Sequence, residues 1–308
     1  MDQKALKEAK DILYTYRTIA LEKKEKAIEQ CMKNEEYALL NREVKLNTLD
    51  ISKALANGED TSGLEKQNAD LQKKLIDMEG KILGNIKFFH CPICQDTGML
   101  VNGGYCNCLT EIYKQVLRNK SGVNELPKFT FADNKIGNID CKQANILNKL
   151  YASMQKYCEE FPNNAYKNIF LFGKVGVGKS CVLSATLNEL LNKGINAQYY
   201  TAFQLNNIFF KYHTTDIKAR GYLLENLINA DVLIIDDLGV EPVIKNVTIE
   251  YLTAVLMERK NKHTIVATNL ESLEIENRYG QRISSRLTDK ATSKLLYLDG
   301  DDLRHIKQ

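Results

Sequence analysis

The sequence predicts an α/β fold with a parallel sheet over residues 119–308, preceded by helices and a compact cysteine cluster. Two observations predict this arrangement. Short apolar runs alternate with segments of helical periodicity in the second half of the chain, which is the pattern of parallel α/β units. Residues 1–85 are rich in Lys, Glu, Leu, Ala and Gln and contain no proline, which favours long helices.

Composition sets outer limits on the class of protein. The 308 residues, 44% of them hydrophobic, can fill at least one core, and a net charge of +3 is too small to indicate nucleic-acid binding by itself. No run reaches the ~18 apolar residues of a membrane span, and the start of the chain is charged, so we expect a cytoplasmic protein with no membrane partner. In that compartment, eight cysteines indicate metal ligands or reduced thiols rather than disulfides.

Residues 1–85 are expected to form a coiled-coil-like helical arm that is broken at residues 57–63. Two apolar stripes follow helical spacing, one at Leu6, Ala9, Leu13, Tyr16 and Ala20 and the other at Leu64, Leu71, Leu75, Met78 and Ile82. Stripes of this kind usually pack on each other as an antiparallel hairpin with a structural role, and binding of a partner is the alternative main role.

Residues 86–118 hold a compact cysteine cluster that predicts a small zinc module. Four thiols within eighteen residues suit tetrahedral Zn²⁺, with the ligands Cys91, Cys94, Cys106 and Cys108. The segment has too few apolar side chains to order itself, and a closed four-cysteine site would be structural rather than catalytic. Two alternatives stay open at this point, namely a redox pair of Cys91 and Cys94 and the replacement of one cysteine ligand by His90.

Five apolar runs predict the strands of the sheet, at residues 168–172, 197–201, 231–236, 263–268 and 294–298. Helices between them would cover both faces, and residues 126–131 look like the start of this domain. Because the carboxyl ends of parallel strands share one edge of a sheet, polar residues that follow the strands should meet there.

Residues 173–180 fit the phosphate-binding pattern G-x-x-x-x-G-K-S, between an apolar run and a segment of helical periodicity. The glycines allow a sharp turn, so that backbone N–H groups and the helix N-terminus point at phosphate oxygens. We predict that ATP binds here, with Lys179 on the β- and γ-phosphates and the Ser180 hydroxyl on Mg²⁺. The expected nucleotide contacts are Gly173, Gly176, Val177, Gly178, Lys179, Ser180 and Cys181. A glycine-rich turn that matches by chance is the alternative.

The third apolar run ends in two carboxylates, Asp236 and Asp237. Such a pair, following a phosphate-binding loop, predicts that Asp236 holds Mg²⁺ through water while Asp237 orients or activates the attacking water. Glu241 is a weaker candidate for the same base, and Asn269, which follows the fourth run, could position water near the γ-phosphate. The alternatives are a solvated strand end and a polar turn residue without a catalytic role.

Four motifs together resemble the DnaC/DnaI-type AAA+ replicative helicase loaders, over residues 119–308. The motifs are the phosphate-binding loop, Leu-Ile-Ile-Asp-Asp-Leu-Gly-x-Glu, Ala-Thr-Asn-Leu and Tyr-Gly-Gln-Arg-Ile-Ser-Ser-Arg-Leu. The resemblance implies an AAA+ P-loop NTPase that hydrolyses ATP and delivers the replicative DNA helicase to DNA in replication, through ATP-dependent self-association. The cysteine cluster and the arm are similar to the DnaI-like branch, whose amino-terminal region binds the helicase.

By the same resemblance, Asn269 takes the sensor 1 position, and Arg286, with Arg282 near it, is similar to the arginine finger that completes a neighbouring subunit's site. The alternative for both arginines is a pair on a solvated helix face. Asp237 departs from the Glu usual in the AAA+ class, so hydrolysis should be slow. The chain also ends soon after its last strand, where Arg304 could replace a sensor 2 arginine.

Residues 203–229 combine aromatic and basic side chains, which can stack on single-stranded bases and contact phosphates. In loaders and initiators this region resembles an inserted helix that touches single-stranded DNA, and we select Lys211, Tyr212 and Arg220 for that role. Core packing explains Phe209 and Phe210 equally well.

Two other functions stay open at this point. One is an IstB-type transposition helper, which uses a similar AAA+ core but whose family generally lacks the cysteine cluster. The other is a non-catalytic adaptor, in which ATP only stabilises a fold that displays the helical arm.

Overall fold

The computed structural model describes all residues except 85, 124–125, 127–128, 134–140 and 306–308, so part of the expected domain start at 126–131 lies outside it. The chain forms two compact units, Glu8–Thr110 and the combination of Met1–Lys7 with Glu111–Gln308. The finer division into an arm, a zinc module and an ATPase domain stays a proposal, because compactness alone does not separate functions.

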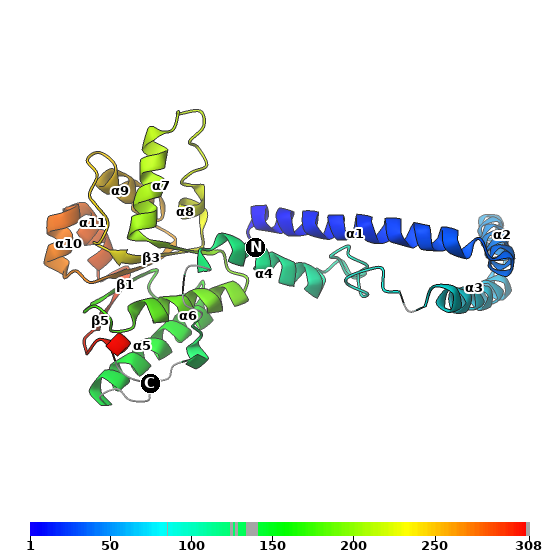
Figure 1. The fold of residues 1–308 in the computed structure, drawn as a ribbon, viewed down its shortest axis with the longest axis horizontal. Helices are drawn as coiled ribbons and strands as arrows, with labels where there is room; N and C mark the ends of the chain where they lie inside the picture. Colours follow the sequence, from blue (N-terminus) through cyan, green and yellow to red (C-terminus); the bar gives the residue numbers. More distant parts are fainter. Residues whose placement is uncertain (85, 124–125, 127–128, 134–140, 306–308) are drawn as a thin grey trace. The chain divides into compact units, whose positions relative to one another are not determined.

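The larger unit is built on a five-stranded parallel sheet with the strand order β2-β3-β4-β1-β5 (Figure 1). Its strands are β1 (Asn168–Gly173), β2 (Ala197–Thr201), β3 (Val232–Leu238), β4 (His263–Thr268) and β5 (Ser293–Leu298). The predicted parallel α/β fold is confirmed, and each predicted strand begins and ends within two residues of an observed strand. The agreement follows from burial on both faces, which makes such strands nearly continuous apolar runs.

Helices cover both faces of this sheet (Figure 1). On one face lie α5 (Cys141–Glu160) and α6 (Lys179–Asn192). On the other face lie α7 (Ala202–Thr214), α9 (Thr248–Glu258), α10 (Ser272–Tyr279) and α11 (Gln281–Thr288). The unit also contains α8 (Glu225–Asn229), most of α4 (Asn107–Lys120), and the 3₁₀ turns η2 (Phe131–Asp133) and η3 (Leu303–His305). Phe170, Leu233 and Val266 of the sheet share one buried core with Phe209, Leu252 and Ile283 of the covering helices.

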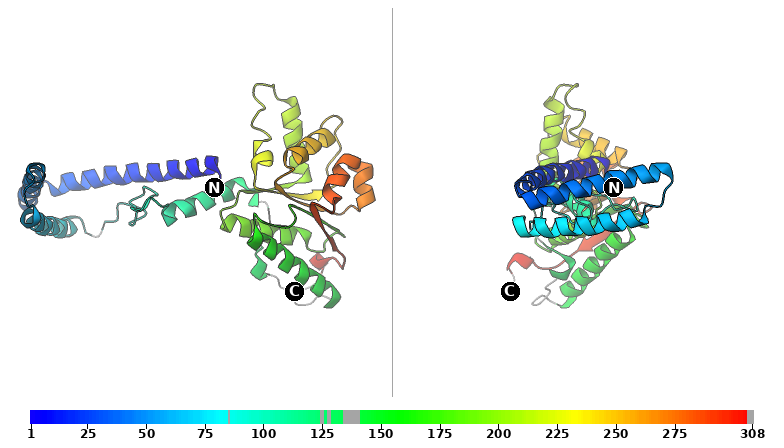
Figure 2. Two further views of the ribbon diagram at one scale, coloured as in Figure 1. Left: turned by 180° about the vertical axis from the view of Figure 1, so that it is seen from behind. Right: turned by 90° about the vertical axis from the view of Figure 1, so that its right-hand side faces the viewer.

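The helical unit contains most of α1 (Gln3–Cys31), together with α2 (Glu35–Asn57) and α3 (Ser62–Leu83). The predicted break at residues 57–63 lies between α2 and α3, where Gly58 ends α2 in a left-handed conformation with φ of 74°. These two helices form an antiparallel hairpin, because the Tyr37 hydroxyl donates to Glu79, 2.7 Å away, and the Asn68 side chain donates to Thr48. Figure 2 shows them side by side.

The apolar stripe of α1 packs on the cysteine cluster, and not on the stripe of residues 64–82 as the hairpin expectation implied. Leu13 lies so close to Gly98 that a Cβ at Gly98 would sit 2.9 Å from the Leu13 methyl, and the rings of Tyr16 and His90 stack with centroids 4.2 Å apart. The reason is that the cluster has few apolar residues of its own and is covered by those of α1. Within the described residues, no helix combines the length and the apolar content that crossing a bilayer requires.

Candidate nucleotide-binding site

The phosphate-binding pattern folds into the strand, loop and helix that its chemistry needs. The loop leaves the end of β1 at Gly173 and enters α6 at Lys179. Gly178, with φ of 97°, adopts the left-handed conformation immediately before the helix. Gly173 lies against β5, where a Cβ would come within 1.9 Å of the Leu298 carbonyl oxygen. Both positions therefore require glycine, and the N-terminus of α6 is left open toward the loop.

Lys179 is the best-connected side chain of this loop. It is only 6% exposed, and its Nζ donates to the carbonyl oxygens of Gly173 and Lys174 at 2.8 and 2.6 Å and to the Asn269 Oδ1 at 2.7 Å. Burial lowers the pKa of the ammonium group, and the nearby carboxylates of Asp236 and Asp237 oppose that shift. The lysine is thus held inside the loop by neutral acceptors, which phosphate oxygens can replace.

The two carboxylates at the end of β3 sit in different environments. Asp236 is 1% exposed, and its carboxylate accepts the Tyr199 hydroxyl and the Asp237 backbone N–H, both at 2.9 Å. The pairing of β3 with β4 shifts between Ile235 and Leu238, and Asp237 adopts a positive φ of 53°. The register shift and the positive φ mark a local distortion of the strand at the second carboxylate.

Asp237 is the carboxylate whose protonation the site perturbs. Burial raises its pKa first, the charge of Asp236 raises it further, and Lys179 and Arg304 act in the opposite direction. The Arg304 guanidinium itself pairs with the Asp302 carboxylate, at 2.6 Å. The tail after β5 lies on the phosphate loop, because the Leu303 N–H donates to the Gly176 carbonyl at 2.9 Å. Arg304 is therefore near the site that the sequence analysis linked to it.

Four of the predicted site residues thus meet at one edge of the sheet. Lys179 follows β1, Asp236 and Asp237 lie at the end of β3, and Asn269 follows β4. Ser180 lies in the first turn of α6, and Asp236 is near enough for its charge to act on Lys179 and Cys181, the residues on either side of Ser180. Hydroxyl and carboxylate oxygens are ligands of the type that Mg²⁺ takes. The remaining predicted contacts, Gly176 and Val177, belong to the loop itself.

Glu241 is held by structural contacts rather than being poised as a base. Its buried carboxylate accepts the Gly239 N–H at 2.9 Å and the Tyr279 hydroxyl, while its carbonyl accepts the Arg278 guanidinium. Both carboxylate oxygens are engaged, and they tie the loop after β3 to α10. These contacts argue against Glu241 as the base, and Asp237 stays the proposed residue for that role. Sequence reasoning missed Tyr279 and Tyr199, because only the packing of separate elements brings these hydroxyls to the acids.

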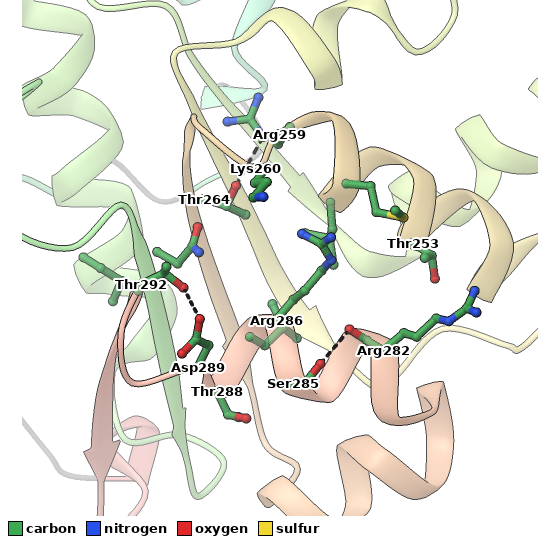
Figure 3. Close-up of a pocket in the computed structure, with 15 residues that line it drawn as sticks. Thr253, Arg259, Lys260, Thr264, Arg282, Ser285, Arg286, Thr288, Asp289 and Thr292 are labelled. Atoms are coloured by element: carbon green, nitrogen blue, oxygen red, sulfur yellow. Dashed lines mark hydrogen bonds between the residues drawn. The ribbon is translucent and has the colours of Figure 1, made fainter.

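Arg286 and Arg282 lie on α11 beside a cavity of about 930 Å³ (Figure 3). The cavity is also lined by Asn168 and Thr264, which lie at the beginnings of strands β1 and β4. The phosphate loop, by contrast, follows the other end of β1. Figure 3 shows the two arginines extending from α11 in different directions. Since a six-residue strand spans roughly 20 Å, this cavity lies well away from the chain's own phosphate loop.

The residues selected for DNA contact lie on and after α7. The Arg220 guanidinium stacks over the Tyr212 ring at 5.1 Å, and that ring packs edge-on against Tyr251. Lys211 is exposed beside them. Of the two phenylalanines left open, Phe209 is buried in the core and Phe210 is half exposed. Single-stranded bases can stack on aromatic rings and on arginine guanidinium groups of this kind.

The four predicted cysteine ligands form one cluster. The Sγ atoms of Cys91, Cys94, Cys106 and Cys108 all lie within 4.8 Å of one another. Tetrahedral Zn²⁺ with bonds of about 2.3 Å would place sulfurs roughly 3.8 Å apart, so the cluster fits zinc. The buried Asp96 carboxylate accepts the backbone N–H groups of His90 and Cys91, at 3.0 and 2.7 Å, and so orders the turn before the first ligand. Among the described residues, the set contains no histidine, and the His90 ring instead stacks on Tyr16.

A glycine-rich loop between β1 and α6, facing acidic residues at the end of β3 of a parallel sheet, defines a P-loop ATP-binding protein. A family model described as "IstB-like ATP binding protein" matches residues 112–299, and the chain belongs to that family. This match also confirms the resemblance to DnaC/DnaI-type AAA+ proteins that the four motifs predicted.

Two relatives of this chain have names that refer to DNA replication. The chain is 29% identical over 171 residues to the "Replicative helicase loader DnaC" of Escherichia coli K12, covering 55% of this chain and 67% of that protein. It is 26% identical over 189 residues to the "Chromosomal replication initiator protein DnaA" of Ureaplasma parvum, covering 58% of this chain and 38% of that protein.

Two solved structures are also similar to this chain. The crystal structure of the DnaC helicase loader has a TM-score of 0.44 at 25% identity and covers 50% of this chain and 90% of its own. The crystal structure of DnaI has a TM-score of 0.44 at 19% identity, and the match covers 57% of this chain and 90% of the DnaI chain.

Proposed function

We propose that this protein is a slow ATPase that delivers a replicative DNA helicase to DNA and switches by ATP-dependent assembly of its subunits. The observation that carries the proposal is the meeting of Lys179, Asp236, Asp237 and Asn269 at one edge of the sheet, in a chain related to DnaC. The family supplies ATP binding, and the loading of a helicase is the finer step that we add.

In this proposal each side chain at the site has a separate task. Lys179 exchanges its bonds with Gly173 and Lys174 for bonds with the β- and γ-phosphates. Ser180 and Asp236 would hold Mg²⁺, which supplies neutralisation of phosphate charge when bound. Asp237 would accept a hydrogen bond from the attacking water and orient it, and Asn269 would help to position that water.

Arg286 is proposed to act on the nucleotide of a neighbouring subunit. Its place beside the cavity at the amino ends of β1 and β4 keeps it from the chain's own phosphate loop. An arginine supplied in this way stabilises transition-state charge and can contribute 10³–10⁵-fold in rate. Single subunits should then hydrolyse ATP poorly. Arg304, near Asp237, is proposed as the residue that senses the γ-phosphate from within the same chain.

The remaining parts are proposed to bind the partners. The helical arm (1–85) and the zinc module (86–118) would grip the helicase, with Zn²⁺ ordering the module. Lys211, Tyr212 and Arg220 would contact single-stranded DNA, because Arg220 and Tyr212 already form a stacked pair beside an exposed lysine.

The test is co-purification of the full chain with the replicative helicase of the same cell, with zinc and ATP binding measured on the same sample. Lys179→Ala should abolish ATP binding and leave capture of the helicase intact. Loss of capture in Lys179→Ala, with the fold preserved, would place helicase binding under nucleotide control. If the unsubstituted chain does not capture the helicase, the proposed loader function is wrong.

A transposition helper is the second candidate, because the matching family model carries the IstB description. Such a protein would use the same ATP site to prepare target DNA for a transposase. Stimulation of a cognate transposase, without capture of the helicase, would favour this candidate over the loader.

A further inference from the structure

We infer that Tyr199 is a positioning residue for Asp236, and that its hydroxyl sets the affinity of the site for Mg²⁺. The inference rests on the proposed ATPase function and adds a residue to that site. Tyr199 lies in β2, outside the phosphate loop and outside both acidic motifs.

The tyrosine reaches the acid from the neighbouring strand. Tyr199 pairs with Ile234 in the register of β2 and β3, and its side chain extends two residues further to place the hydroxyl 2.9 Å from the Asp236 Oδ2. Tyr199 is 4% exposed and Asp236 is 1% exposed. A hydrogen bond to a charged acceptor at such a buried position is worth more than one in water.

The backbone of Tyr199 is anchored on its other side. β2 is an edge strand of the sheet, and the Tyr199 N–H donates to the Ser121 carbonyl at 2.9 Å. Gly122 packs on the Tyr199 carbonyl so closely that a Cβ there would come within 2.5 Å of that oxygen. These contacts fix the backbone of Tyr199, and the residue is only 4% exposed, so that the surrounding packing restrains the ring from turning away from Asp236.

The two donors leave Asp236 one defined orientation. The Asp237 N–H binds Oδ1 and the Tyr199 hydroxyl binds Oδ2, so that the carboxylate cannot rotate, while each oxygen keeps a lone pair for a water of Mg²⁺. Partners that orient a ligand in this way typically contribute 10–100-fold in metal affinity. Removal of the hydroxyl should free one oxygen and weaken Mg²⁺ binding without touching the phosphate loop.

The test compares Tyr199→Phe with Tyr200→Phe in the full chain. Phenylalanine keeps the ring. Tyr200 is a matched control because it is the next residue of the same strand and, within the described part of the chain, its hydroxyl donates only to the Gln198 side chain, at 3.4 Å. Calorimetric titration with ATP at a series of Mg²⁺ concentrations, and in EDTA, gives the Mg²⁺ midpoint and the metal-free affinity. Thermal unfolding checks the fold of each variant.

For Tyr199→Phe we expect a Mg²⁺ midpoint raised about 10-fold or more, with the affinity for ATP in EDTA unchanged. Tyr200→Phe should match the unsubstituted chain in both measurements. An unchanged midpoint in Tyr199→Phe overturns the inference, and so does an equal loss of affinity with and without Mg²⁺, which would make the tyrosine merely structural. Failure of the unsubstituted chain to bind ATP under any condition overturns the proposed function itself.

Discussion

The Nζ of Lys179 donates a hydrogen bond to the Oδ1 of Asn269, 2.7 Å away. The contact joins the loop after β1 to the end of β4, two segments about ninety residues apart in the chain. Because both residues are placed by adjacent parallel strands, the contact needs no loop rearrangement to form. In the proposed mechanism, bound phosphate takes the lysine and leaves the Asn269 amide to face the attacking water.

This contact predicts a separation of binding from hydrolysis. Asn269→Ala should lower the rate of ATP hydrolysis about 10²-fold, the effect of removing one positioned polar group. The affinity for ATP should change little, because Lys179 is still held in the loop by the Gly173 and Lys174 carbonyls before ATP binds and can still exchange these bonds for bonds with phosphate. Steady-state hydrolysis and equilibrium titration check both statements, with Asn163→Ala, an exposed position remote from the loop, as the control. A collapse of affinity in Asn269→Ala would assign the residue to binding.

The raised pKa of Asp237 predicts opposite effects of one substitution on stability and on activity. Burial and the charge of Asp236 favour the protonated carboxyl of Asp237 in the folded state. The stabilisation that this protonation contributes is therefore fully present below the ordinary pKa of Asp, and it is lost as the pH rises through the pKa of the folded state. At neutral pH the ionised group therefore costs stability. Asp237→Asn, which tolerates the positive φ, should raise the thermal midpoint at pH 7 and lower hydrolysis by ~10² or more.

The matching measurement is thermal unfolding of both proteins as a function of pH, without nucleotide. The gain from Asp237→Asn should shrink toward zero as the pH falls below about 4, the ordinary pKa of Asp, because the carboxyl then becomes protonated in both the folded and the unfolded state. A gain that is independent of pH would mean that Asp237 is not ionised at pH 7, and the base role would have to be withdrawn.

The location of Arg286 predicts complementation between inactive subunits. Arg286→Ala should lower hydrolysis about 10³-fold, and Lys179→Ala should abolish it. A mixture of the two variants should recover part of the activity, because a Lys179→Ala subunit can lend its arginine to a subunit with an intact loop. Arg282→Ala, on the same helix, serves as the comparison. If no ratio of the two variants shows more activity than either alone, Arg286 does not act across subunits.

The cysteine cluster predicts one zinc ion per chain. Cys94→Ser should lower the bound zinc to near zero and unfold the module, since binding of structural zinc contributes about 10–16 kcal/mol to such folds. Cys31→Ala is the control, because Cys31 is a buried thiol outside the cluster. Elemental analysis of the purified chain measures the stoichiometry. Zinc retained in full by Cys94→Ser would remove that residue from the ligand set.

Most of the features that could be predicted are specified by residues that are close together in the sequence. The residues from Gly173 to Ser180, the pair Asp236 and Asp237, and the four cysteines are each specified within short segments, so that local sequence reveals their type of chemistry. The five strands could be placed because burial on both faces demands apolar residues at nearly every position.

Contacts between distant segments could not be predicted in the same way. The apolar stripe of α1 is compatible with α3 or with the cysteine cluster, and only the packing selected the cluster. Glu241 has the residue type of a base, and its engagement by Gly239 and Tyr279 became visible only in the fold.

The amino-acid sequence by itself determined the parallel α/β fold, the nucleotide loop and the identity of the acids beside it. These features depend on the spacing of neighbouring residues along the chain. The tertiary structure alone decided that Tyr199 holds Asp236, that Asn269 holds Lys179, and on which edge of the sheet Arg286 lies. The physical reason is that hydrogen bonds and burial act at distances of a few ångströms in space, and strand order sets which side chains come that close.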